Sequence, residues 1–179
     1  MTFQRYQNPD HPDWPQIWEL YQKSFPVCEL RLEEDHRKAM TTRSDFYCVG
    51  IWEDHAFLGL IFYWYNGDFC YVEHFAINPE YRGKQYGSHC LTEFCKQFPQ
   101  IILEIDLPTD DISIRRQRFY ERLGFLVSGY QHAHPPYRIQ DEPHHLLALS
   151  YPHPISQEQQ KKFLAYREQD IMQYSEPKR

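Results

Sequence analysis

The chain has 179 residues, a length that suits a single domain. Hydrophobic residues make up 41% of it and aromatic residues 17%, so the material for one sizeable core is present. The net charge is −6 and no dense run of lysine and arginine occurs, which argues against a nucleic-acid partner. The acidic balance either suits a cationic substrate or serves solubility alone.

Cysteine usage and the length of apolar runs bear on the compartment. The cysteines are Cys28, Cys48, Cys70, Cys90 and Cys95. They form no CxxC pair, which is typical of buried thiols in a reducing compartment. No stretch approaches the ~18 apolar residues of a membrane span, and the N-terminus lacks a signal-peptide core. We therefore expect a cytoplasmic protein with no membrane partner.

The first half of the chain predicts one strand, two helices and three more strands. Asp13 is a candidate N-cap for the first helix, and the second helix is rich in charge. Alternating apolar residues, interrupted by turn residues, then predict the three strands. The predicted elements are a strand at 2–6, helices at 13–25 and 30–40, and strands at 46–52, 57–65 and 69–77.

The second half predicts helices at 85–97 and 113–123, a buried strand at 101–106, strands at 125–132 and 144–151, and a terminal amphipathic helix. Two hairpins combined with two helical crossovers imply a mixed sheet with helices on its faces, in the α/β (α+β) class. We expect one domain over residues 1–150. The segment 151–179 is expected to be a helical extension packed on or beside that domain.

The segment from Tyr71 to Ser88 is the most informative about chemistry. A strand leads into a loop that contains Arg82, Gly83, Lys84 and Gly87, and the loop opens a helix. Glycines let the backbone approach an anion closely, and the first amides of a helix point toward it at the positive end of the helix dipole. The arrangement suits a pyrophosphate. A plain tight turn is the alternative.

Two motifs resemble the GNAT superfamily of acetyltransferases. The run Arg82-Gly83-Lys84-Gln85-Tyr86-Gly87 is similar to its acetyl-CoA loop, Arg/Gln-x-x-Gly-x-Gly/Ala, with Gln85 in place of the central glycine. That replacement is harmless only where φ at residue 85 is negative. The run from Phe119 to Phe125 is similar to the Phe-Tyr-x-x-x-Gly-Phe end of the superfamily's late helix. The resemblance covers roughly residues 2–150 and implies the GNAT fold, a central mixed, largely antiparallel twisted sheet of about seven strands with helices on both faces.

The resemblance further implies an acyltransferase that uses acetyl-CoA as co-substrate and needs no metal. Backbone N–H groups around Phe75–Ile77, in the strand at 69–77, are expected to hold the pantetheine and polarise the thioester carbonyl, and the loop is expected to hold the diphosphate. Two positions where the family often has Asn and Ala are Ser113 and Arg116 here, and nearby arginines either reach phosphates or form a solvated helix face. The expected cofactor-binding residues are Phe75, Ala76, Ile77, Arg82, Gly83, Lys84, Gln85, Tyr86, Gly87, Ser88, Ser113 and Arg116.

Two residues are candidates for catalysis. The resemblance implies that Tyr120 faces the coenzyme sulfur, as general acid to the departing thiolate. Glu73 is the candidate base, because Tyr71-Val72-Glu73 resembles the same strand of polyamine acetyltransferases. Strand alternation predicts that Glu73 shares a face with Tyr71 and Phe75, where burial would raise its pKa, and that His74, a weaker candidate base, points to the opposite face. A structural or substrate-binding role for Glu73 is the alternative.

The last predicted hairpin is rich in histidine but shows no zinc-site spacing, so we expect no metal there. We expect its proline-stiffened loop, including Tyr137, to contact the substrate, as Glu73 would. The expected reaction moves the acetyl group of acetyl-CoA to a primary amine of a small molecule by direct attack in a ternary complex.

Two other functions remain open: a protein or peptide N-acetyltransferase, and a non-catalytic acyl-CoA-binding module. An open groove between the Leu30 region and the final hairpin would favour peptides, whereas a closed pocket lined by acids would favour a polyamine or similar cation. A homodimer, formed through edge strands or the terminal helix, is also left open.

Overall fold

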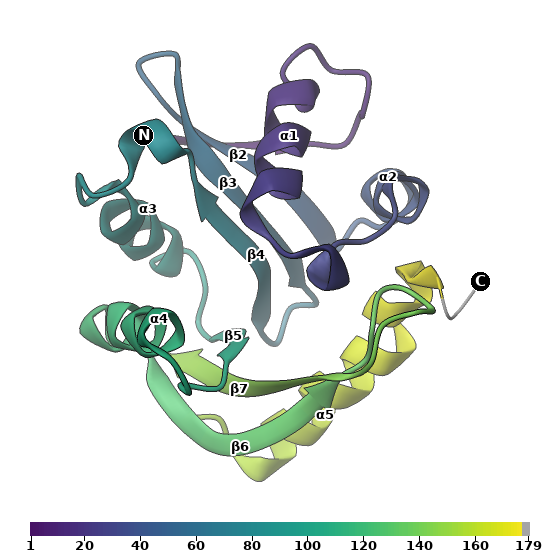
Figure 1. Ribbon diagram of the computed structural model, residues 1–179, viewed down its shortest axis with the longest axis vertical. Coiled ribbons are helices and arrows are strands. Elements are labelled where there is room, and N and C mark those ends of the chain that lie inside the picture. The colour runs from purple at the N-terminus through teal and green to yellow at the C-terminus, as the bar shows by residue number, and fades with distance from the viewer. Residues whose placement is uncertain (177–179) are drawn as a thin grey trace.

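The computed structural model describes residues 1–176 and holds a seven-stranded sheet with helices on both faces (Figure 1). The strands are β1 (Thr2–Tyr6), β2 (Phe46–Glu53), β3 (Ala56–Tyr65), β4 (Cys70–Ile77), β5 (Ile101–Asp106), β6 (Leu126–His134) and β7 (His144–Tyr151). The helices are α1 (Trp14–Ser24), α2 (Glu33–Thr42), α3 (Tyr86–Cys95), α4 (Asp111–Arg122) and α5 (Gln157–Gln169). Short 3₁₀ turns are η1 (Val27–Glu29), η2 (Pro79–Tyr81) and η3 (Ile171–Tyr174).

The strand order is β1-β2-β3-β4-β5-β7-β6. Every neighbouring pair is antiparallel except β4 and β5, which run parallel because α3 crosses over between them. The mixed, largely antiparallel sheet that the sequence predicts is therefore confirmed. In Figure 1, β2 to β4 lie in the upper half of the molecule and β5 to β7 in the lower half.

Each face of the sheet has its own apolar core. On one face, Phe62 and Trp64 of β3 belong to the same cluster of buried residues as Ile17 of α1, and Phe163 of α5 packs into that cluster too. On the other face, Ile61 of β3 packs in a cluster with residues of α3. Alternate residues of β3 thus serve opposite cores, as the period of two in a strand requires. Among the described residues, no helix is both long enough and apolar enough to cross a membrane.

The second helix begins later than the sequence predicts. Residues 27–29 form η1, and α2 begins only at Glu33, so Arg31 lies in the extended segment between them. Its side chain turns inward and is fully buried. An arginine in that position must meet a counter-charge inside the protein, and that counter-charge defines the site described below.

The strands β4 and β5 separate along their length. They pair only from Cys70 to Val72 and from Ile101 to Leu103, although β4 continues to Ile77 and β5 to Asp106. Beyond the paired part, β4 has a backbone edge that no strand of the described chain covers on that side. The divergence creates a wedge-shaped opening in the middle of the sheet.

Candidate active site

A cavity of about 310 Å³ lies in the opening between β4 and β5. Its wall brings together residues that the sequence analysis chose from separate motifs, and it joins them to the diverging part of β5. The predicted residues in this wall are Glu73, Phe75, Ala76, Ile77, Arg82, Arg116 and Tyr120. Five of the twelve predicted cofactor-binding residues therefore share one contiguous surface with Tyr120 and Glu73.

The loop before α3 has the backbone that an anion site requires. Gly83 and Gln85 both have positive φ, 74° and 64°. No side chain caps the start of α3, so its first amides are left for an external acceptor. The condition under which Gln85 would be harmless, a negative φ, is not met, because the position that is glycine in the family motif takes the left-handed conformation here.

The other predicted residues of the loop run from the end of β4 into the first turn of α3. Arg82 donates from Nε to the carbonyl oxygen of Ile77 at 2.8 Å, which ties the loop to the end of β4. Gly87 lies close to the sheet and to α4, since an added Cβ would be 3.4 Å from Ile77 and 3.8 Å from Phe119. The side chains that border a shallow hollow at the start of α3 include Lys84, Gln85, Tyr86 and Ser88.

The two predicted residues of α4 have partners within the protein. Ser113 is buried and takes part in the capping box of the helix, with its hydroxyl donating to the carbonyl oxygen of Asp110 at 3.0 Å. Arg116 forms an ion pair with Asp106 at the end of β5. Arg116 therefore stands at the cavity wall instead of on a solvated helix face, while Arg115 and Arg118 border a separate surface hollow.

Tyr120 projects into the same cavity from α4. Burial raises its pKa to about 12, an effect that the nearby Arg116 reduces and Cys95 reinforces. The hydroxyl is therefore protonated throughout the neutral range, as a proton donor must be before it acts.

A bulge in β4 reverses the alternation after Glu73, which itself lies on the same face as Tyr71, as predicted. Phe62 is opposite His74 and Tyr63 is opposite Val72, so Glu73 is the extra residue of the strand. The predicted alternation is wrong at this point. Glu73 and His74 both lie on the α1 and α2 face, with His74 Nδ1 3.8 Å from Glu73 Oε2, whereas Phe75 packs with the opposite core.

Four hydrogen bonds hold the Glu73 carboxylate. Arg31 donates to both oxygens at 2.6 Å, Tyr137 donates to Oε1 at 2.6 Å, and Trp64 donates to Oε2 at 3.1 Å. The glutamate side chain is only 1% exposed. Burial by itself would raise its pKa, but the charge and hydrogen bonds of Arg31 outweigh burial and lower it far below its ordinary value. The expected raised pKa is wrong, and a carboxylate so strongly stabilised as an anion is a poor proton acceptor.

His74 is no better placed for that role. Its Nε2 lies 3.0 Å from the carbonyl oxygen of Glu29, which requires a proton on that nitrogen. Burial lowers the pKa of His74 to about 4, with Arg31 adding to the effect and Glu73 opposing it.

A second buried carboxylate, Glu104 of β5, lies next to the first. Tyr71 donates to it at 2.6 Å and Arg167 of α5 at 3.0 Å, and His132 also bonds to it. Burial would raise its pKa, but His134, His132 and Arg167 hold it down at about 2. Glu73 and Glu104 are thus two fixed anions, each paired with an arginine from outside the sheet.

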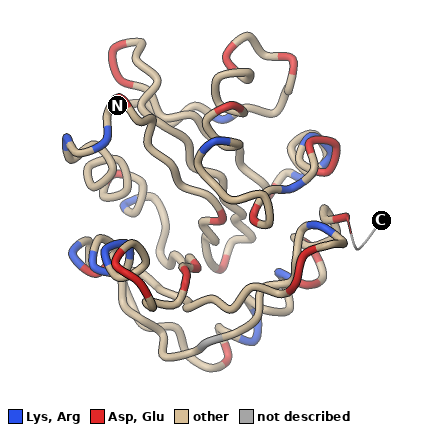
Figure 2. Tube along the Cα trace, in the orientation of Figure 1, with Lys and Arg blue, Asp and Glu red and all other residues tan. Residues whose placement is uncertain are grey.

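A second cavity, of about 300 Å³, adjoins the first. Glu29, Glu73, Glu104, Ile105 and Arg116 line both cavities, so the two form one continuous cleft. His134, the last residue of β6, and Tyr137 of the loop that follows complete the second cavity. Figure 2 shows acidic positions in the middle of the molecule, where the two halves of the sheet meet, as well as at its periphery.

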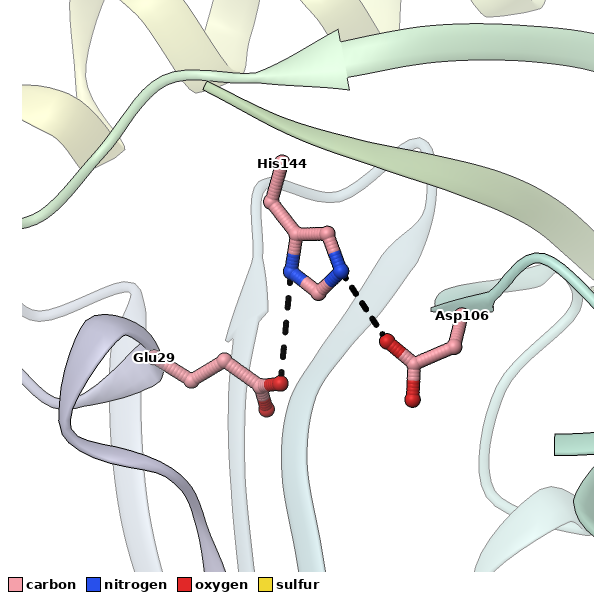
Figure 3. A group of neighbouring side chains, drawn as sticks. All are labelled: Glu29, Asp106 and His144. Carbon is pink, nitrogen blue, oxygen red and sulfur yellow. Dashed lines mark ion pairs between the residues drawn. The ribbon is translucent and has the colours of Figure 1, made fainter. Parts of the chain in front are cut away.

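Three side chains of this second cavity form a compact group: Glu29 of η1, Asp106 of β5 and His144 of β7 (Figure 3). The sequence analysis missed this group, together with Arg31, Trp64 and Arg167. Asp106 alone had a local signal, as a charged residue that ends a buried apolar strand. The other members come from distant parts of the chain.

The sequence matches the family described as the acetyltransferase (GNAT) family over residues 14–125, which is more than half of the chain. The chain belongs to the GNAT acetyltransferase family. It is therefore an acyltransferase, as the two motifs predict. A search of curated proteins gives no match.

Solved structures agree with the family assignment. A protein from Bacteroides thetaiotaomicron assigned to the GNAT family is 28% identical, with a TM-score of 0.91 over 96% of this chain and 98% of the other. The ribosomal-protein-S18-alanine N-acetyltransferase of Escherichia coli is 16% identical, with a TM-score of 0.59 over 88% and 96%. An aminoglycoside 6'-N-acetyltransferase complexed with coenzyme A is 13% identical, with a TM-score of 0.58 over 87% and 99%. The latter two show the fold alone.

Proposed function

We propose that this GNAT protein transfers the acetyl group of acetyl-CoA to a primary amine of a small cationic molecule, by direct attack in a ternary complex. The observation that carries the proposal is the continuous cleft, in which one cavity lies in the opening of the sheet and the other is lined by carboxylates. Two substrates can occupy such a cleft together, with their reactive ends at the shared wall.

The residues of the first cavity and its loop fit acetyl-CoA. The uncapped start of α3 and residues 82–88 suit the diphosphate, and Gly87 leaves space that a side chain would fill. The unpaired edge of β4 at Phe75, Ala76 and Ile77 suits the amide groups of a pantetheine. Acetyl-CoA, when bound, supplies an activated acetyl thioester.

Tyr120 is the proposed general acid. Its hydroxyl lines the first cavity and keeps its proton at neutral pH. Ser113 and Arg116 are proposed to support the donor site through α4, although both already bond within the protein. Glu73 is proposed to shape the substrate site by fixing Tyr137, because its own hydrogen-bonding positions are taken.

The second cavity favours a small cation over a peptide. Arg138 Nε donates to the carbonyl oxygen of Leu30 at 3.1 Å, which joins the final hairpin loop to the segment before α2. The groove that an extended peptide would need between these two regions is therefore bridged. Glu29 and Glu142 add carboxylates to the wall, and these would attract an ammonium group.

A thiol-release assay with acetyl-CoA tests the proposal against polyamines, amino acids, aminoglycosides and peptides. We expect turnover with small amines that carry two or more positive charges, and much less with peptides. Turnover with peptides alone would establish the protein or peptide N-acetyltransferase instead. Coenzyme A binding without turnover of any amine would contradict the enzymatic proposal and support a non-catalytic acyl-CoA-binding module.

A further inference from the structure

His144, the first residue of β7, lies between two carboxylates in the wall of the second cavity (Figure 3). Its Nε2 is 3.0 Å from Oδ1 of Asp106, and its Nδ1 is 4.0 Å from Oε1 of Glu29. Both contacts are ion pairs, the first as short as a hydrogen bond and the second too long for one. A water molecule or an amine nitrogen can bridge the second gap.

The group is not arranged like the ligands of a metal ion. Its ligand atoms lie within 4.8 Å of one another, but the two carboxylates face different nitrogens of the same imidazole (Figure 3). A metal-bound histidine uses one nitrogen for the metal and the other for a hydrogen bond outside the ligand set. Here one carboxylate orients the ring and the other faces its free nitrogen, which is the arrangement of a proton acceptor with its orienting acid.

The transfer needs such an acceptor. An alkyl ammonium has a pKa of about 10.4, so only about one molecule in a thousand is neutral near pH 7. Glu73 and Glu104 line the cleft, but arginines hold both as anions, which makes them poor proton acceptors. A neutral imidazole has one ring nitrogen that can accept a proton while the other donates to a carboxylate.

Glu29 is placed to receive the cationic end of the acceptor. It lines both cavities and faces His144. Burial and the charge of Asp106 raise its pKa, against opposing effects of His144 and Arg116. A raised pKa indicates that the nearby positive charges do not fully balance the Glu29 carboxylate. The ammonium group of a bound amine would supply the missing charge.

We infer that His144 is the proton acceptor of the acetyl transfer, that Asp106 orients its imidazole, and that Glu29 holds the ammonium group of the acceptor. The inference rests on the proposed function. The ammonium loses one proton to Nδ1 of His144, directly or through one water. The neutral nitrogen then forms the C–N bond as the C–S bond breaks.

The remaining protons balance as follows. The departing thiolate takes the hydroxyl proton of Tyr120, and the second proton lost by the nitrogen returns to that tyrosine through solvent. His144 releases its proton to solvent, so each turnover yields one amide, one thiol and one proton.

Other titratable and charged groups surround the imidazole. Glu29 of η1 and Asp106 of β5 face it, and Cys28 of η1 and Glu142 of the loop before β7 line the same cavity. Arg116 of α4 acts through its ion pair with Asp106. The pH profile therefore reports the whole group, and single substitutions are needed to assign it.

The test compares His144→Gln with His145→Gln, a matched control at an exposed neighbour outside the cavity wall. With an amine that the wild type acetylates, His144→Gln should lower kcat/KM by about 10²–10⁴-fold at pH 7. The loss should shrink steadily toward pH 10, because a growing fraction of the amine is then neutral without help. Glu29→Gln should raise KM for the amine more than it lowers kcat.

Folding is checked by the melting temperature and by coenzyme A affinity, which His144→Gln should leave unchanged because its side chain is 40% exposed. No wild-type turnover of any amine would remove the proposed function itself. An active wild type with an unchanged profile in His144→Gln, or with an equal loss at every pH, would overturn this inference alone. Activity that a chelator abolishes and Zn²⁺ restores would also overturn it, in favour of a metal site.

Discussion

Both carboxylate oxygens of Glu73 accept hydrogen bonds from the guanidinium of Arg31, each at 2.6 Å, although 42 residues separate the two in the chain. Neither side chain reaches solvent to any useful extent. A buried pair of this kind is costly to break from one side, because the remaining charge has no water to solvate it. The pair fixes the bulge of β4 and, through Tyr137, the loop that borders the second cavity.

Arg31→Met should therefore destabilise the protein by roughly 3–5 kcal/mol, the usual cost of leaving one member of a buried ion pair alone. Adding Glu73→Gln should recover a large part of that loss. The control is Arg37→Met, which breaks an exposed i,i+4 pair with Glu33 and should cost at most about 0.5 kcal/mol. Denaturant unfolding measures all three, and equal effects of Arg31→Met and Arg37→Met would contradict the prediction.

The two buried carboxylates also predict how stability depends on pH. The folded-state pKa values of Glu73 and Glu104 lie below the ordinary value of 4.5, at about 2 for Glu104. Their contribution is therefore present above pH 4.5 and should be lost as the pH falls from there toward 2. Unfolding curves across this range should show the loss, and Arg31→Met should flatten it. Stability that stays constant down to pH 2.5 would rule out the lowered values.

Tyr120→Phe tests the general acid. Removing the hydroxyl should lower kcat by about 10²-fold or more while the affinity for acetyl-CoA changes little, because the ring still packs in the cavity wall. Tyr65→Phe is the control, since that hydroxyl donates to the carbonyl oxygen of Gly67 at a distant hairpin. Steady-state kinetics and calorimetry separate the two effects. Unchanged turnover in Tyr120→Phe would remove the acid role.

Gln85→Gly tests the strain in the loop before α3. A side chain at φ 64° costs on the order of 1 kcal/mol, so glycine should raise the melting temperature by roughly 2–4 °C. His55→Gly, at φ 68° in a remote turn, should give a similar gain. Only Gln85→Gly should alter coenzyme A affinity, and we expect it to increase. An affinity that responds equally to both substitutions would separate the loop from the donor site.

Arg167→Met tests the link between α5 and the sheet. Arg167 bonds both Glu104 and the carbonyl oxygen of Ala133, so its loss leaves a buried carboxylate with a weaker set of partners. We expect a stability loss of several kcal/mol and a higher pKa for Glu104. Lys162→Met on the same helix removes only an exposed pair with Glu158 and should be nearly neutral. A melting-temperature comparison decides, and similar values for the two variants would disprove the link.

The sheet and the donor loop were predictable because their signals are local. Strand alternation, turn residues and the glycines of residues 82–88 each act within a few positions of the chain. The surroundings of Glu73 were not predictable in that way. One extra residue in β4 reverses the alternation after Glu73 without changing the apolar pattern, and the partner of Glu73, Arg31, lies in a charged segment that looked like a helix.

The group formed by Glu29, Asp106 and His144 could not be predicted from local sequence either. Asp106 ends a recognisable strand, but Glu29 and His144 join it only because η1 and β7 meet across the opening of the sheet. The hairpin is rich in histidine, but composition alone could not show that His144 contacts Asp106 while His132 and His134 contact Glu104.

Arg167 of α5, which donates to Glu104, is made late in translation. A nascent chain that has left the ribosome only as far as β7 already contains every strand, yet it lacks Arg167 and the carbonyl of Tyr174 that holds Arg31. Translation of the last helix should therefore be the event that locks the interior charges in place, and premature stops after β7 should yield chains that quality-control proteases remove.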